Sequence, residues 1–177
     1  MIDGSVRIKK VYLETTLFNY YFDENRDAHA DTVTLFDESA CGKFKPYTSL
    51  HVIEELEAAT ADKCDKMLLL IGRYNITVLA ATYEIDNLAR RYLSEGALPQ
   101  GSLTDASHIA AASVYALDMI ISLNFRHIVR DKTIKMTGAI NTLLGYPVIE
   151  IYSPMEEIDN EKTRYHLGRG SRDTTDD

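Results

Sequence analysis

Four oxygen-bearing side chains stand at the ends of predicted helices and strands, where proteins commonly build sites. Glu14 and Asn124 each follow a short apolar strand, Glu55 lies on the helix after the second strand, and Asp105 begins an Ala-rich helix. Parallel strands place their carboxyl ends at one edge of a sheet, where α/β proteins bind ligands. We therefore expect Glu14 and Asn124 to share an edge, and the start of the Asp105 helix to return to it.

The chemistry that this set predicts is metal-assisted hydrolysis. Carboxylates gathered in one cleft repel one another, and a divalent cation is the usual compensation. A set of carboxylates with one amide oxygen, and with no His or Cys, suits a hard ion such as Mg²⁺ or Mn²⁺. Such an ion acidifies its bound water and neutralises charge on a phosphoryl group. The sequence thus favours cleavage of a phosphodiester.

Each of these residues also has a plainer interpretation. Glu14 could be a strand-end acid in solvent, Asp105 could complement a helix N-terminus for about 0.3–1 kcal/mol, and Asn124 could form a turn. Glu55 flanks the apolar stripe of its helix, whereas Glu54 points away from it. The combination favours a site more than any member does alone.

Basic residues follow directly after the strand that Asn124 ends. Arg126, His127 and Arg130 come first, with Lys132 close behind, in a chain of net charge −8. This stretch is either a solvated helix face or a patch that holds nucleic-acid phosphates beside the metal; we take Arg126, His127 and Arg130 as the substrate-binding candidates. His108 is expected to lie off the buried stripe of its helix and to be structural or surface-exposed.

Strands alternate with helices along the chain and are joined by short loops. This alternation predicts a mainly parallel sheet with helices on both faces. The fold class is therefore α/β, with about five strands in one domain over residues 1–159, followed by a polar tail at 160–177 that is predicted to be disordered. The expected strands are 11–13, 45–48, 76–79, 119–123 and 146–152, and the main helices are 28–40, 50–60, 62–72, 83–95, 105–117 and 131–144.

Composition excludes several classes of protein. A chain of 177 residues most simply holds one domain. No apolar run approaches the roughly 20 residues of a membrane span, and the N-terminus lacks the features of a secretory signal. Two cysteines in no metal or redox spacing fit reduced thiols in a cytoplasmic protein. The negative charge argues against a protein that coats nucleic acid, but not against a nuclease.

Four segments in order resemble the PIN-domain ribonucleases, nearest to toxins of the virulence-associated protein C type. They are L-E-T-T at 13–16, S-x-x-V-x-x-E-L at 49–56, D-A-S-H-I-A-A-A at 105–112 and S-L-N-F-R-H-I at 122–128. The resemblance covers roughly residues 11–158, and G-A-L-P at 96–99 and G-Y-P at 145–147 fit one bacterial subgroup.

The resemblance implies a three-layer α/β/α sandwich and an endoribonuclease that depends on Mg²⁺ or Mn²⁺. It also implies an RNA substrate, a small antitoxin partner and a homodimer. Its four acidic positions fall on Glu14, Glu55, Asp105 and Asn124, and its two hydroxyl positions on Thr15 and Ser122.

Two departures from the family pattern bear on activity. Glu14 stands where the family usually has Asp, so its carboxylate reaches further by about one C–C bond, ~1.5 Å. Asn124 is neutral, which should weaken a second metal more than the first. The leading hypothesis is a toxin ribonuclease in which a metal-bound water attacks RNA. The alternatives are a PIN-like binding module that has lost efficient catalysis and, more weakly, another Mg²⁺ phosphohydrolase, although E-T-T does not supply the D-x-D of one such class.

Overall fold

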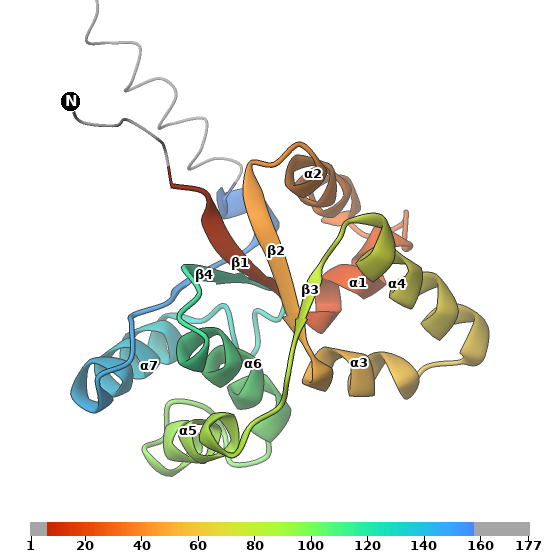
Figure 1. The fold of residues 1–177 in the computed structure, drawn as a ribbon. Coiled ribbons are helices and arrows are strands. Elements are labelled where there is room, and N and C mark those ends of the chain that lie inside the picture. Colours follow the sequence, from red (N-terminus) through yellow and green to blue (C-terminus); the bar gives the residue numbers. More distant parts are fainter. Residues whose placement is uncertain (1–6, 158–177) are drawn as a thin grey trace, which may run out of the picture.

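The computed structural model describes residues 7–157, so the tail predicted at 160–177 lies outside the described residues. Five parallel strands form one sheet in the order β3-β2-β1-β4-β5 (Figure 1). This confirms the predicted parallel sheet. The strands are β1 Lys9–Leu13, β2 Phe44–Ser49, β3 Thr77–Leu79, β4 Met119–Ile121 and β5 Glu150–Tyr152.

Helices cover both faces of the sheet, which gives the predicted three layers. Helices α1 to α4 gather on one side and α5 to α7 on the other (Figure 1). No helix within residues 7–157 is long and apolar enough to cross a membrane. The helices are α1 Thr15–Tyr21, α2 His29–Ala40, α3 Leu50–Glu57, α4 Ala61–Arg73, α5 Tyr83–Ser94, α6 Leu103–Val114 and α7 Asp131–Leu144.

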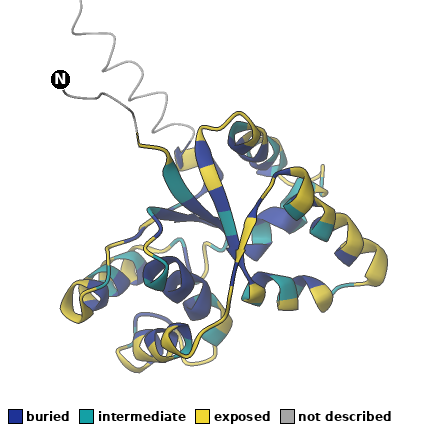
Figure 2. Ribbon diagram, viewed as in Figure 1, coloured by how far each residue is buried: buried dark blue, intermediate teal, exposed yellow. Residues whose placement is uncertain are grey.

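The core runs through the two central strands and α6. The last three residues of β1 and all of β4 are buried, as expected for strands covered on both faces. Helix α6 is buried over residues 106–113 (Figure 2). Its small side chains, Ala106 and Ala110 to Ala112, allow this close packing. Helix α6 is therefore a fixed platform for the residues in its first two turns.

A buried polar network attaches α6 to its neighbouring helices. The Tyr92 hydroxyl donates to Asn141 Oδ1 at 2.5 Å. The Asn141 Nδ2 group donates to Ser113 Oγ and to the Pro147 carbonyl, both at 2.8 Å. These bonds connect α5, α6 and α7 and satisfy polar groups that would be costly to bury alone.

The strand order creates a switch point between β1 and β4. From β1 the chain builds outward through β2 and β3, and it then returns to add β4 and β5 on the opposite side. In open parallel sheets the crevice for ligands lies at such a point, beyond the carboxyl ends of the strands. Glu14 follows β1 and Ser122 follows β4, so both stand at this crevice.

Several predicted boundaries were wrong by a few residues. Helix α6 begins at Leu103 rather than at Asp105, which places Asp105 in its first turn. Strand β4 ends at Ile121, because the Leu123 N–H bonds to the Thr16 hydroxyl instead of to a neighbouring strand. Strand β5 begins only at Glu150.

Candidate metal and active site

Glu14 is the most deeply placed acid of the site. It is 3% exposed, and its Oε2 accepts hydrogen bonds from Thr16 Oγ1 at 2.5 Å, Ser122 Oγ at 2.7 Å and the Thr16 N–H at 3.2 Å. Glu14 itself caps α1, because its side chain accepts from the Thr16 N–H. Among the described residues no donor reaches Oε1. One oxygen is thus fixed and the other is left as an acceptor.

Two further hydrogen bonds fasten the corner after β1 to the end of β4. Thr16 Oγ1 accepts from the Leu123 N–H at 2.9 Å, and Ser122 Oγ accepts from the Asn124 N–H at 2.9 Å. The hydroxyls that bond Glu14 are therefore oriented by backbone donors of the neighbouring segment. The resemblance gives site hydroxyls to Thr15 and Ser122, whereas the hydroxyl of Thr16 was not expected to bond Glu14.

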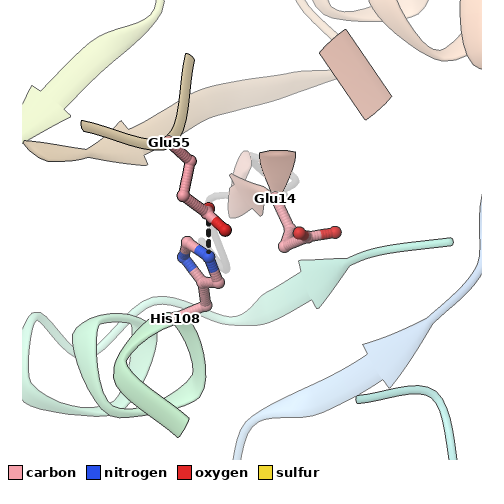
Figure 3. A group of neighbouring side chains, drawn as sticks. All are labelled: Glu14, Glu55 and His108. Carbon is pink, nitrogen blue, oxygen red and sulfur yellow. Dashed lines mark hydrogen bonds and ion pairs between the residues drawn. The ribbon is translucent and has the colours of Figure 1, made fainter. Parts of the chain in front are cut away.

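Glu55 is held from α1 and from α6. Its Oε2 accepts a hydrogen bond from the Thr15 hydroxyl and lies 2.8 Å from His108 Nε2 (Figure 3). The other ring nitrogen of His108 lies 2.8 Å from the Tyr12 hydroxyl, which in turn lies 2.7 Å from Ser49 Oγ. A continuous chain of polar groups therefore runs from β2 through β1 to the Glu55 carboxylate.

Glu14, Glu55 and His108 form a compact group at the switch point. One ligand atom from each lies within 4.8 Å of the other two, and Figure 3 shows the side chains side by side. His108 is fully buried, so the expectation that it lies off the buried face was wrong: α6 is packed on every side there. The spacing in the sequence could have predicted this position, because residues three apart in a helix, such as Asp105 and His108, lie on the same face.

Asp105 and Asn124 form a second group beside the first. Asp105 Oδ1 accepts from Asn124 Nδ2 at 2.9 Å, and its Oδ2 lies 2.7 Å from His127 Nδ1. Asn124 Oδ1 accepts from the His127 N–H at 3.0 Å. The four acidic positions predicted from the sequence therefore do converge on one edge, but as two adjoining clusters, each containing a histidine.

Burial and charge set the protonation of the first cluster. Burial raises the pKa of Glu14, and the His108 charge and the bonds from Thr16 and Ser122 offset this only in part. Partial burial opposes ionisation of Glu55, yet the hydrogen bonds from His108 and Thr15 lower its pKa overall. Burial disfavours the His108 cation, but its bond to Glu55 and the charges of the nearby acids raise its pKa. The carboxylates of Glu14 and Glu55 therefore favour the protonated, positively charged form of His108.

The predicted substrate-binding residues differ in their solvent exposure and in whether they have a partner within the protein. Arg126 and Arg130 are exposed, and neither has an ion-pair partner within residues 7–157. His127 is mostly buried, with 24% of its side chain exposed, and is occupied by Asp105. Only the two arginines are therefore available to a ligand as they stand.

Two cavities flank the site. One of about 380 Å³ contains Glu55, His51 and Ser107 in its lining. The other, of about 620 Å³, lies between α1 and α4. Thr16 is part of its lining, together with Arg26, Lys63 and Lys66 among others. Asp23 and Asp62 also line this cavity and form ion pairs with Arg26 and Lys66, so its charges are largely balanced.

The fold has known counterparts among solved structures. One is the complex VapBC2 from Rickettsia felis, bound to a DNA fragment from its promoter, with a TM-score of 0.52, 12% identity and coverage of 81% of this chain and 98% of the other. A second is DNA-bound VapBC from Salmonella typhimurium, with a TM-score of 0.53, 15% identity and coverage of 83% and 99%. This chain folds as a VapC-like PIN domain. No family profile and no curated protein matches the sequence.

The likeness extends over nearly the whole length of both structures and over about four fifths of this chain. At 12–15% identity it establishes the fold alone, because one fold can carry many functions. What the site does has to be argued from its own residues.

Proposed function

We propose that this protein is a metal-dependent endoribonuclease and the toxin of a toxin–antitoxin pair. The observation that carries the proposal is the convergence of Glu14 and Glu55 at the switch point, within 4.8 Å of each other and of His108. Two solved structures that share its fold are VapBC complexes, which supports a small antitoxin as partner. The homodimer stays a prediction.

The residues present fit a divalent cation. Glu14 offers Oε1, which accepts no hydrogen bond from residues 7–157 and is reached by solvent, and Glu55 offers a carboxylate that is ionised at neutral pH. Asp105 and Asn124 are the further proposed ligands, since a carboxylate oxygen that accepts one hydrogen bond keeps a second lone pair. The ion, when bound, supplies an acidified water and positive charge at the phosphoryl group.

The chain itself supplies positioning. Thr16 and Ser122 hydrogen-bond to Glu14, and Thr15 hydrogen-bonds to Glu55. Asn124 and His127 do the same for Asp105. These bonds restrict the rotamers of the three carboxylates. Fixed groups of this kind lower the barrier because they need no reorganisation during the reaction. Arg126 and Arg130 would bind the RNA phosphates that flank the cleaved bond.

One observation favours a second candidate, a PIN-like binding module with weak catalysis. Both oxygens of Asp105 and the Asn124 amide oxygen already accept hydrogen bonds within the protein. If these bonds persist, fewer ligands remain for an ion. Such a module would bind RNA or its partner protein without cleaving RNA.

The test is incubation of the purified chain with mixed RNA in Mn²⁺, in Mg²⁺ and in excess chelator. We expect endonucleolytic fragments with metal and none with chelator, with activity restored when the metal is returned. Metal binding and RNA binding without cleavage would instead identify the binding module. Cleavage that is indifferent to chelator would refute the metal-dependent mechanism.

The exposed arginines give a separate prediction about substrate binding. The double variant Arg126→Ala/Arg130→Ala should raise KM for RNA about 10-fold or more, with little change in kcat. Loss of two phosphate contacts should also reduce the slope of log affinity against log salt by about 1.4. The matched control is Arg90→Ala/Arg91→Ala, which removes two charges from α5, where both residues are in ion pairs. An unchanged KM and slope in the first variant would exclude this patch.

A further inference from the structure

We propose that His108 is itself a ligand of the metal, so that this centre selects a first-row transition-metal ion over Mg²⁺. The inference deepens the proposed function and rests on its claim that Glu14 and Glu55 bind an ion. It changes the chemical class of that ion, because an imidazole nitrogen suits transition metals, whereas Mg²⁺ takes oxygen ligands.

The first support is the position of the ring nitrogen. His108 Nε2 lies 2.8 Å from Glu55 Oε2 and belongs to the group whose ligand atoms all fall within 4.8 Å of one another. Adjacent ligands of an octahedral ion with bonds of about 2.1 Å are about 3.0 Å apart. The pair therefore needs only a small outward movement to place an ion where the hydrogen bond now lies.

The second support is the way the ring is held. Ligating histidines bond through their second nitrogen to a neighbouring polar group, which fixes the tautomer and the ring plane. Here the Tyr12 hydroxyl lies 2.8 Å from His108 Nδ1 and 2.7 Å from Ser49 Oγ. The phenol can accept from Nδ1 while it donates to Ser49. Without an ion Nε2 donates to Glu55 Oε2, and it would release this proton when it binds a metal.

The third support is the Glu14 carboxylate. Its side chain is buried, its Oε2 takes three hydrogen bonds, and no donor within the described part of the chain reaches its Oε1. Solvent reaches Oε1, so an ion can bind this oxygen without displacing a protein donor. His108 and Glu55 come from α6 and α3, so three separate elements bring their ligand atoms to one point (Figure 3).

Pulsed electron paramagnetic resonance on the wild-type protein with Mn²⁺ is the primary test. We expect hyperfine coupling from a directly bound ¹⁴N nucleus, and isothermal titration should give affinity in the order Mg²⁺ < Mn²⁺ < Co²⁺. Mn²⁺ bound without ¹⁴N coupling, equal affinity for Mg²⁺ and Mn²⁺, or no binding of any of these ions would each overturn the inference. This experiment needs no variant and so does not depend on one that folds.

The variant His108→Gln adds an independent measurement. We expect it to lose the ¹⁴N coupling and to lower the preference for Mn²⁺ over Mg²⁺ by about 10–100-fold. His51→Gln is the matched control, because its ring is adjacent to that of His108 but outside the cluster, and it should change neither readout. Coupling that survives His108→Gln in a folded protein would reject His108 as the ligand.

The two proposals fail in distinguishable ways. Nitrogen-coordinated Mn²⁺ in a protein that leaves RNA intact would remove the ribonuclease and keep this metal centre. Metal-dependent RNA cleavage with no nitrogen at the ion would keep the ribonuclease and remove His108 from its ligands.

Discussion

Glu14→Gln is expected to abolish RNA cleavage while it makes the metal-free protein more stable. Glutamine keeps an oxygen that can accept from Thr16 and Ser122, so the corner after β1 retains its hydrogen bonds. It loses the negative charge that would bind the ion. A metal centre contributes several kcal/mol to the transition state, so kcat should fall about 10³-fold or more.

The stability of this variant has a definite pH dependence. Burial raises the pKa of Glu14 in the folded state above its ordinary value of 4.5. Below the ordinary value both states are protonated, and the two proteins should differ little. As pH rises through the window up to the raised pKa, the wild type loses stability relative to Glu14→Gln, because the folded chain resists ionisation.

Thermal melts in chelator at pH 4 and pH 8 measure this effect. We expect a gap that opens from pH 4 toward pH 8, with Glu14→Gln melting at the higher temperature. Glu57→Gln is the control: it makes the same chemical change on an exposed face of α3 and should alter neither cleavage nor Tm. Wild-type cleavage by Glu14→Gln would refute the assignment of Glu14.

The sequence was sufficient for the fold and for the edge of the sheet at which the site lies. Runs such as 11–13 and 119–121 are apolar without alternation, which is typical of central parallel strands, and they are buried as β1 and β4. An acid directly after such a strand stands at the carboxyl edge by geometry alone. Glu14 could therefore be placed from its position in the chain.

The side-chain partners of His108 and His127 could not be predicted from the sequence. The sequence predicts His108 off the buried stripe, but this alanine-rich helix packs against neighbours on all sides over residues 106–113. His127 is predicted to bind substrate because it follows Asn124 in a basic stretch, and the sequence did not predict that its Nδ1 lies 2.7 Å from Asp105 Oδ2. Side-chain partners between distant elements depend on packing distances, and periodicity does not contain these.

Asp105→Asn should also cut kcat about 10³-fold, and it should weaken Mn²⁺ binding at least 10-fold. Asp105 is 19% exposed at its side chain and takes hydrogen bonds on both oxygens, from Asn124 and His127. Asparagine can keep only one of these acceptors and carries no charge. The variant thus removes both the proposed ligand and the group that orders the segment after β4.

Metal affinity separates these two contributions. If Mn²⁺ binds to Asp105→Asn as tightly as to the wild type while cleavage is lost, Asp105 only positions Asn124 and His127 and does not bind the ion. Asp31→Asn is the matched control, because Asp31 is likewise the third residue of its helix, α2. A simple helix-terminus effect would be worth about 0.3–1 kcal/mol at either position. If Mn²⁺ affinity and cleavage fall in Asp105→Asn but not in Asp31→Asn, the effect comes from the proposed site at the end of β4 and not from the charge at a helix terminus.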